Sequence, residues 1–294
     1  MAQYTVSFRG GFSDRSGIKP ENTIIQTKNF DNRTRIALIN ATSIILNKKY
    51  PRLSSQYVEE SQTLIKRFWA EVYSRPIDWT ELYSAGVLLS TISDTFLEDT
   101  YDAILSVIEY IVGVVDKGGG YSFYYEGGYY TAAQFYNDVF EKEYVGYRII
   151  DKLIVPITDT LEADEILAAV QTPYTDVRQH INKSLHFLSD RDSPDYANSI
   201  KESISAVERM CSIIVGKSCT LGDALSKLQT KGIAINNQMK QAFEKLYAYT
   251  NGASGIRHAG ELDGSDATFA EAKFMLVSCC AFVNYLTELM AKCP

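Results

Sequence analysis

The sequence is poor in the residues that build most metal and redox sites. Its 294 residues include only three histidines and five cysteines, and no two cysteines form a C-x-x-C pair. Cys279 and Cys280 are adjacent, a spacing that suits neither a disulfide framework nor a zinc site. We therefore expect reduced, mostly packed thiols, with this adjacent pair inside an apolar helix, and we predict neither a metal nor a cofactor.

The common catalytic signatures are also missing. There is no G-x-x-x-x-G-K-[ST] phosphate loop, no G-x-S-x-G nucleophile elbow and no H-E-x-x-H zinc motif. Gly118-Gly119-Gly120 lacks the Lys-Ser/Thr that a phosphate loop needs, and it follows an apolar helical pattern rather than a strand. The sequence therefore argues against an NTPase.

Uninterrupted hydrophobic runs are short. The two longest, residues 104–115 and 274–289, are broken by Glu109 and by Ser278, Asn284 and Glu288, whereas a spanning helix needs about 20 apolar residues. Both runs predict buried core helices. The first residues lack the basic and then apolar pattern of a secretory signal, so we expect a cytoplasmic protein without a membrane segment.

Positive charge is scarce overall. The net charge is -7, from 29 Lys+Arg and 36 Asp+Glu. Residues 174–294 hold 13 of each kind, which leaves 16 basic and 23 acidic residues in residues 1–173. Because an acidic protein has no general electrostatic affinity for nucleic acid, any contact with RNA must be local.

What the sequence does contain is helical periodicity. A hydrophobic fraction of 46% and a charged fraction of 22% are typical of a folded protein. Asp31 is placed to cap a helix that runs to Lys49 and ends at Tyr50-Pro51. Further helices are predicted over residues 54–73 and 78–96, and the pattern continues through 97–115, with or without a kink. Shorter helices are predicted over residues 131–144 and 162–170.

Two segments of the N-terminal half favour other structures. Residues 147–157 place two β-branched runs about Asp151-Lys152, which predicts a β-hairpin. Residues 121–130 contain six tyrosines and phenylalanines beside glycines; such rings can stack on bases. We favour a loop or short hairpin whose rings cover the edge of the core.

Thr172-Pro173 punctuates the chain where its charge balance changes, so we place a domain boundary there, between residues 1–172 and 173–294. The second half predicts five helices, over residues 174–189, 194–215, 220–229, 236–249 and 268–292. Ser193-Pro194 has the composition of a helix start, with serine as the cap.

The chemistry of the second half concentrates at one place. In Asn251-Gly252-Ala253-Ser254-Gly255-Ile256-Arg257-His258-Ala259, a histidine and an arginine follow a glycine-bearing loop. Histidine moves protons near neutral pH, and the arginine fork suits phosphate oxygens, so the pair suggests a phosphodiester site. An isolated Arg-His dipeptide also arises by chance and then caps a helix or lies in solvent.

Several stretches resemble a known family. In the C-terminal half these are residues 198–208, 243–250, Gly255-Ile256-Arg257-His258-Ala259 and 272–278, which resemble the HEPN-like C-terminal domain of AbiJ-type abortive infection proteins. In the N-terminal half they are Phe12-Ser13-Asp14-Arg15, Ile24-Ile25-Gln26 and residues 146–158, which resemble an AbiJ-type N-terminal domain.

The resemblance implies a mainly α fold: an N-terminal helical domain with a small β-hairpin, in a sensor or regulatory role, followed by a HEPN-like bundle. It implies an antiphage protein of the bacterial cytoplasm, triggered by phage, whose second domain cleaves RNA without a metal and as a homodimer; tRNA is one candidate substrate. The catalytic residues implied are Arg257 and His258, with weaker RNA contacts from Asn251 and Lys245.

One departure from the family keeps an alternative open. The arginine and histidine of such enzymes are separated by about four to six residues, whereas Arg257 and His258 are adjacent and would diverge by about 100° on a helix. The alternative is a non-catalytic module that dimerises or binds a partner protein, nucleotide or nucleic acid. His180 and His186 are expected to be surface or packing residues, since nothing completes a metal site around them. Glu202 is expected to lie on a solvated face of its helix with local ion pairs.

Overall fold

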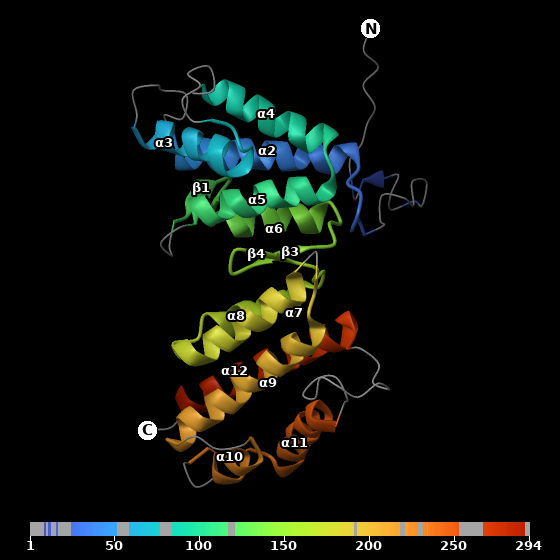
Figure 1. Ribbon diagram of the computed structural model, residues 1–294, viewed down its shortest axis with the longest axis vertical. Helices are drawn as coiled ribbons and strands as arrows, with labels where there is room; N and C mark the ends of the chain where they lie inside the picture. The colour runs from blue at the N-terminus through green and yellow to red at the C-terminus, as the bar shows by residue number, and fades with distance from the viewer. Residues whose placement is uncertain are drawn as a thin grey trace. The chain divides into compact units, whose positions relative to one another are not determined.

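The computed structural model describes residues 9, 11–12, 16, 25–51, 59–76, 84–116, 121–190, 193–217, 221–228, 232–233, 235–252 and 267–291. These residues form eleven α-helices, one π-helical turn and two β-hairpins, so the predicted mainly helical fold is confirmed. The chain divides into two compact units, residues 1–158 and 159–294 (Figure 1). The predicted boundary at residues 172–173 follows helix α7, whereas this division precedes it.

Unit 1 contains five of the α-helices and both hairpins. In chain order its elements are α2 (Asn32–Lys49), α3 (Glu59–Arg67), the π-helical turn η2 (Phe68–Val72), α4 (Ala85–Glu98), α5 (Tyr101–Val115), β1 (Phe123–Tyr125), β2 (Gly128–Tyr130), α6 (Ala132–Lys142), β3 (Arg148–Ile150) and β4 (Leu153–Val155).

The helix that begins after Asp31 is confirmed at both ends. The Asp31 carboxylate accepts a hydrogen bond from the Thr34 amide at 2.8 Å, and α2 ends at Lys49. The helical patterns predicted over residues 78–96 and 97–115, however, do not form one continuous helix. Asp99 and Thr100 adopt extended backbone, with ψ of 178° and 159°, so α4 and α5 are separate helices rather than one kinked helix.

The core of unit 1 lies between α2, α4, α5 and α6 (Figure 1). Tyr136 of α6 is fully buried, and its hydroxyl lies 2.7 Å from the Thr42 hydroxyl of α2. Burial raises the pKa of Tyr136, so the ring stays neutral and the hydroxyl pair is satisfied without a charge. Because both groups are partnered, this polar contact is compatible with a closely packed interior.

Both hairpins turn through two residues with left-handed backbone. The predicted hairpin over residues 147–157 is confirmed: β3 and β4 pair antiparallel, and Asp151 and Lys152 have φ of 45° and 70°. In β1–β2 the turn is Glu126-Gly127, with φ of 42° and 94°. Positive φ at both central residues is the geometry that matches the twist of paired strands.

The tyrosine-rich segment forms the β1–β2 hairpin and has two different faces. Phe123 and Tyr130 pack their rings against Phe135 of α6, both with centroids 5.4 Å apart, which confirms that this segment covers the edge of the core. On the other face Tyr124 and Tyr129 are 55% and 74% exposed, with ring centroids 5.3 Å apart.

A buried ion network joins Arg9 to the start of α2 and to the end of α6. Glu143, 2% exposed, follows α6 and accepts from the Nε atoms of Arg9 and Arg33, each at 2.7 Å. Arg9, 4% exposed, also pairs with Asp31 and donates to Thr34. Burial alone would raise the pKa of Asp31, but the hydrogen bonds from Thr34 and the charge of Arg9 outweigh it and lower that pKa.

Backbone hydrogen bonds reinforce the same region. The Gln26 amide donates to the Tyr144 carbonyl, and the Gly146 amide donates to the Gln26 carbonyl, both at 2.8 Å. A Cβ atom at Gly146 would lie 2.7 Å from the Thr27 side chain, so only glycine permits this close approach. The segment around Gln26 is therefore attached to the α6–β3 connection by main-chain and side-chain bonds together.

Unit 2 is entirely helical where it is described. Its helices are α7 (Thr160–Val170), α8 (Thr175–Ser189), α9 (Tyr196–Val215), α10 (Leu221–Leu228), α11 (Asn237–Gly252) and α12 (Phe269–Ala291). The five helices predicted after residue 173 are confirmed. The predicted cap at Ser193 is wrong: Asp195 caps α9, because its carboxylate accepts from both the amide and the side chain of Asn198, at 2.9 and 2.6 Å.

Small side chains allow α8 and α9 to pack closely. The Ser184 hydroxyl lies 3.0 Å from the Ser199 hydroxyl and 2.7 Å from the Ser203 hydroxyl, and all three residues are fully buried. Helix α9 also packs against α12, which in turn contacts α7 and α8 (Figure 1). These four helices form the core of unit 2.

Removing the charge of Glu143 tests the ion network. In the Glu143→Gln protein Arg9 and Arg33 lose their shared carboxylate, and breaking a buried pair costs about 3–5 kcal/mol. We expect the unfolding transition of unit 1 to fall by roughly 6–20 °C in calorimetry. Glu98→Gln, at an exposed position of α4, is the matched control and should leave the transition in place. Equal melting of the two variants would contradict a structural role for the network.

Candidate functional site

The described residues that frame the predicted site are the end of α11 and the start of α12. The Tyr249 hydroxyl of α11 donates to Glu271 of α12 at 3.0 Å. Thr268 and Glu271 form a reciprocal cap: the Thr268 amide donates to the Glu271 carboxylate at 2.8 Å, and the Glu271 amide donates to the Thr268 hydroxyl at 3.3 Å. The chain thus leaves α11 and enters α12 at neighbouring points.

The charges at this junction are set by hydrogen bonds. The Thr268 amide, then the Thr268 hydroxyl and the Tyr249 hydroxyl, lower the pKa of Glu271. Burial, followed by the nearby Glu271 carboxylate, raises the pKa of Tyr249. Tyr249 therefore remains a neutral donor and Glu271 an ionised acceptor near neutral pH, which keeps the two helix ends together.

The predicted site residues are only partly within the described structure. Arg257 and His258 belong to the segment 253–266 between α11 and α12 and lie outside the described residues. Asn251 is in the last turn of α11, and its side chain also lies outside the description. Lys245 is exposed on α11, one turn before Tyr249 and therefore on the face of α11 that leads to the junction.

The other two histidines lie on α8. His186 is exposed, as expected. The Nδ1 atom of His180 lies 2.7 Å from the Glu202 carboxylate of α9, so Glu202 pairs with the neighbouring helix rather than within its own. One turn earlier on α8 and two turns later on α9, Arg209 of α9 pairs with Asp176 of α8. Both contacts lie at the α8–α9 seam, and they stabilise the packing of the two helices.

Thiols and carboxylates of the described residues do not form a metal centre. Cys211, Cys279 and Cys280 are free and buried, as predicted for packed thiols, and Cys219 and Cys293 lie outside the description. Burial raises the pKa of Cys279 to about 12, so its thiol is neutral and unreactive. No group of three potential ligands among His, Cys, Asp and Glu occurs within the part of the chain that the structure describes.

Helix α12 is long and apolar enough to cross a membrane, judged by length and composition alone. In the 18-residue stretch of α12 that meets this criterion, 39% of the residues are buried inside the structure. Its buried residues recur every three or four positions, from Ala272 to Leu286, and they pack against α9, α7 and α8. This arrangement is that of a core helix, as the sequence predicted for residues 274–289.

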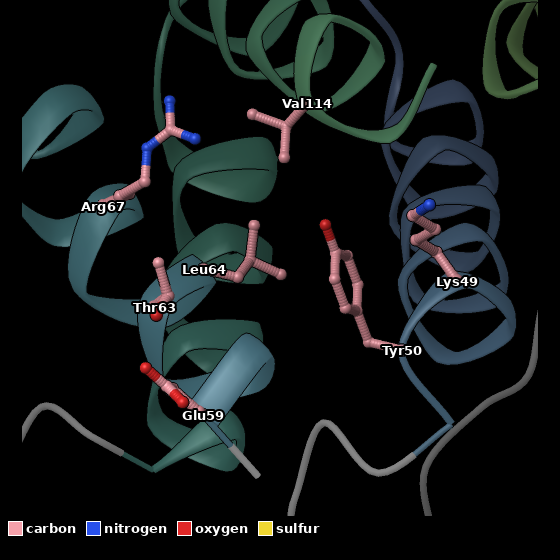
Figure 2. A pocket seen from close by; sticks show the side chains of 7 residues that line it. All are labelled: Lys49, Tyr50, Glu59, Thr63, Leu64, Arg67 and Val114. Carbon is pink, nitrogen blue, oxygen red and sulfur yellow. The ribbon is translucent and has the colours of Figure 1, made fainter. Parts of the chain in front are cut away.

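One cavity in unit 1 has no counterpart among the residues singled out from the sequence. It has a volume of about 520 Å³ and lies between the end of α2, helix α3 and helix α5 (Figure 2). Its lining is Lys49, Tyr50, Glu59, Thr63, Leu64, Arg67 and Val114. In the sequence Tyr50-Pro51 indicated only the end of a helix, because residues about 15 and 60 positions apart become neighbours only after the helices have packed.

Loss of the Tyr249 hydroxyl tests the junction of α11 and α12. In the Tyr249→Phe protein we expect amide hydrogen exchange to accelerate several-fold in the last turn of α11 and the first turn of α12, because the bond to Glu271 is gone. Tyr285→Phe, elsewhere on α12, serves as the control. Unchanged exchange in the Tyr249 variant would show that the two helix ends are held by other contacts.

Comparison with known proteins identifies the N-terminal part. The sequence model of a family described as AbiJ N-terminal domain 4 matches residues 10–172, which is more than half of the chain. The matched range includes α2 to α7 and therefore the whole ion network around Glu143 except Arg9. No curated protein and no solved structure matches the chain. The chain belongs to the AbiJ N-terminal domain 4 family, and membership of an AbiJ family suggests an antiphage role in abortive infection.

Proposed function

We propose that the protein is an abortive-infection endoribonuclease: the C-terminal unit is a HEPN-like domain that cleaves RNA after phage infection, and the N-terminal unit senses infection or restrains cleavage. The observation that carries the proposal is the combination of two parts in one chain. An AbiJ-type N-terminal domain is followed by a helical unit whose sequence resembles HEPN ribonucleases at Gly255-Ile256-Arg257-His258-Ala259.

We propose the α11–α12 junction as the place of this chemistry. The segment with Arg257 and His258 starts and ends at helix termini that Tyr249 and Glu271 hold together. Lys245 adds an exposed positive charge on the same face of α11. Since the whole chain is acidic, such a local charge is the kind of contact through which RNA would bind.

In the proposed mechanism His258 removes the proton from a ribose 2′-hydroxyl, and the 2′-oxygen attacks the adjacent phosphorus. The bond between phosphorus and the 5′-oxygen breaks, and that oxygen takes a proton from His258 of the partner subunit. Arg257 stabilises the negative charge that builds on the phosphate oxygens. The products are a 2′,3′-cyclic phosphate and a 5′-hydroxyl end.

This mechanism requires a homodimer. The single histidine of the site, His258, cannot be base and acid in the same step, whereas two copies of the chain related by a two-fold axis supply both groups. Asn251 and Lys245 would contact phosphates of the bound strand, and tRNA is the first substrate to test. We propose that the protein acts in the cytoplasm and that its reaction needs no metal.

The adjacency of Arg257 and His258 favours a second candidate function. Two neighbouring residues of a helix diverge by about 100°, so a helical Arg-His pair would not face one phosphate. In that case the C-terminal unit is a non-catalytic module that dimerises or binds a partner protein, nucleotide or nucleic acid. The two candidates differ in whether protection against phage needs His258.

An RNA cleavage assay tests the first candidate. The purified full-length protein is incubated with tRNA and total RNA in EDTA, beside His258→Ala, Arg257→Ala and the control His186→Ala. We expect each of the first two changes to reduce cleavage by about 10²-fold or more, as for a lost general acid–base or charge-stabilising group. His186→Ala, on exposed α8 surface, should cleave like the wild type.

A second set of results would contradict the ribonuclease. If RNA stays intact with the wild-type protein, and both alanine variants still protect cells from phage, the non-catalytic module replaces the ribonuclease. Circular dichroism and light scattering on each variant exclude loss of folding or of dimerisation as the cause of an effect.

A further inference from the structure

The cavity at the end of α2 has the size of a small-molecule site. Its volume of about 520 Å³ falls within the roughly 300–1,000 Å³ of ligand pockets in proteins. All of its lining residues belong to unit 1, so the cavity is independent of the proposed RNA site in unit 2. What it binds is determined by the chemistry of its walls.

Two cationic side chains lie on opposite sides of the cavity (Figure 2). Lys49 extends from the last turn of α2, with its ammonium group 3.9 Å from the ring centroid of Tyr121. That ring is in turn held by a 3.0 Å hydrogen bond from its hydroxyl to the Lys48 carbonyl. The contact with the ring fixes the position of the Lys49 charge without neutralising it.

The second cation, Arg67, is the last residue of α3, and Glu71 of the following π-helical turn holds it in place. Its Nε and one terminal nitrogen donate to the Glu71 carboxylate at 2.9 and 3.1 Å, and the Tyr110 hydroxyl donates to the same carboxylate at 2.8 Å. A guanidinium group has five N–H donors, so this fork orients Arg67 and leaves donors for a ligand. Burial, then the bond to Glu71, raises the pKa of Tyr110 and keeps it a donor.

The remaining walls are partly apolar and partly polar. Leu64 and Tyr50 are 4% and 7% exposed, and with Val114 they form the apolar part between the two cations (Figure 2). Thr63 and Glu59 contribute a hydroxyl and a carboxylate from α3. The lining therefore combines two positive charges, one negative charge and an apolar wall.

We propose that this cavity binds a mononucleotide. Lys49 holds its phosphate, since the ammonium group donates charge-assisted hydrogen bonds to phosphate oxygens, and the Arg67 guanidinium on the opposite side of the cavity donates to acceptors at the other end of the ligand. The base lies against Leu64, Val114 and Tyr50, and the Glu59 carboxylate accepts from sugar hydroxyls or from an exocyclic amine of the base. A free phosphate would use only the cations, and a nucleoside only the other walls, so the ligand that uses the whole lining carries both parts.

Isothermal titration of the full-length protein with AMP, adenosine and inorganic phosphate tests the proposal, with thermal denaturation as a second readout. We expect AMP to bind more tightly than adenosine or phosphate alone, and to raise the melting temperature of the wild type. In Lys49→Met the dissociation constant for AMP should rise about tenfold or more, because a charge-assisted contact is lost. Lys48→Met removes an exposed charge from the same turn and should change it less than twofold.

A further variant separates the two halves of the ligand. Glu59→Gln should weaken AMP and adenosine while leaving phosphate binding unchanged. The proposal is overturned if none of the three ligands gives heat or a thermal shift at millimolar concentration. It is also overturned if phosphate binds as tightly as AMP, or if Lys49→Met and Lys48→Met bind AMP alike while both melt at the wild-type temperature. These results do not involve RNA cleavage, so the proposed ribonuclease stands or fails separately.

Discussion

The structure of the N-terminal unit depends on one buried carboxylate. Glu143 accepts from Arg9 and Arg33, which come from different parts of the chain, and Arg9 continues the network to Asp31 at the start of α2. Removing these charges from water is costly, and the cost is offset only when every member keeps its partner. The network therefore fixes how Arg9, the start of α2 and the end of α6 are arranged, and the core helices pack within that frame.

The two units contribute different parts of the functional account. Unit 1 has most of the family sequence, which continues through α7 of unit 2, and it has the ion network and the cavity between α2, α3 and α5. Unit 2 is a helical bundle around α12, whose start is joined to the end of α11 through Tyr249 and Glu271. A ligand site in the first unit and an RNA-cleaving site in the second would together form a sensor and an effector in one chain. Ligand binding in the first unit could restrain or release the second only through a change in the contacts or the order of one of them.

The fold was largely predictable because its signals are local. Asp31 as a helix cap, the Asp151-Lys152 turn and the apolar stripe of α12 follow from periodicity and turn chemistry, and all three are confirmed. Where one local signal competed with another, the prediction was wrong: Ser193 has the composition of a cap, but Asp195 offers two acceptors to Asn198. Partners distant in the chain, such as Glu143 with Arg9, carry no local signal at all. The cavity was missed for the same reason, and the roles of Arg257 and His258 stay predictions.

We propose that Arg257 and His258 make the C-terminal unit a ribonuclease that acts during infection. The most direct measurement is to sequence the 2′,3′-cyclic phosphate ends of RNA from phage-infected cells that express the wild-type protein or an equal amount of the His258→Ala protein. We expect new ends, concentrated at a few sites, only with the wild type and only after infection. Identical end profiles for the two proteins, with both protecting the cells, would contradict it.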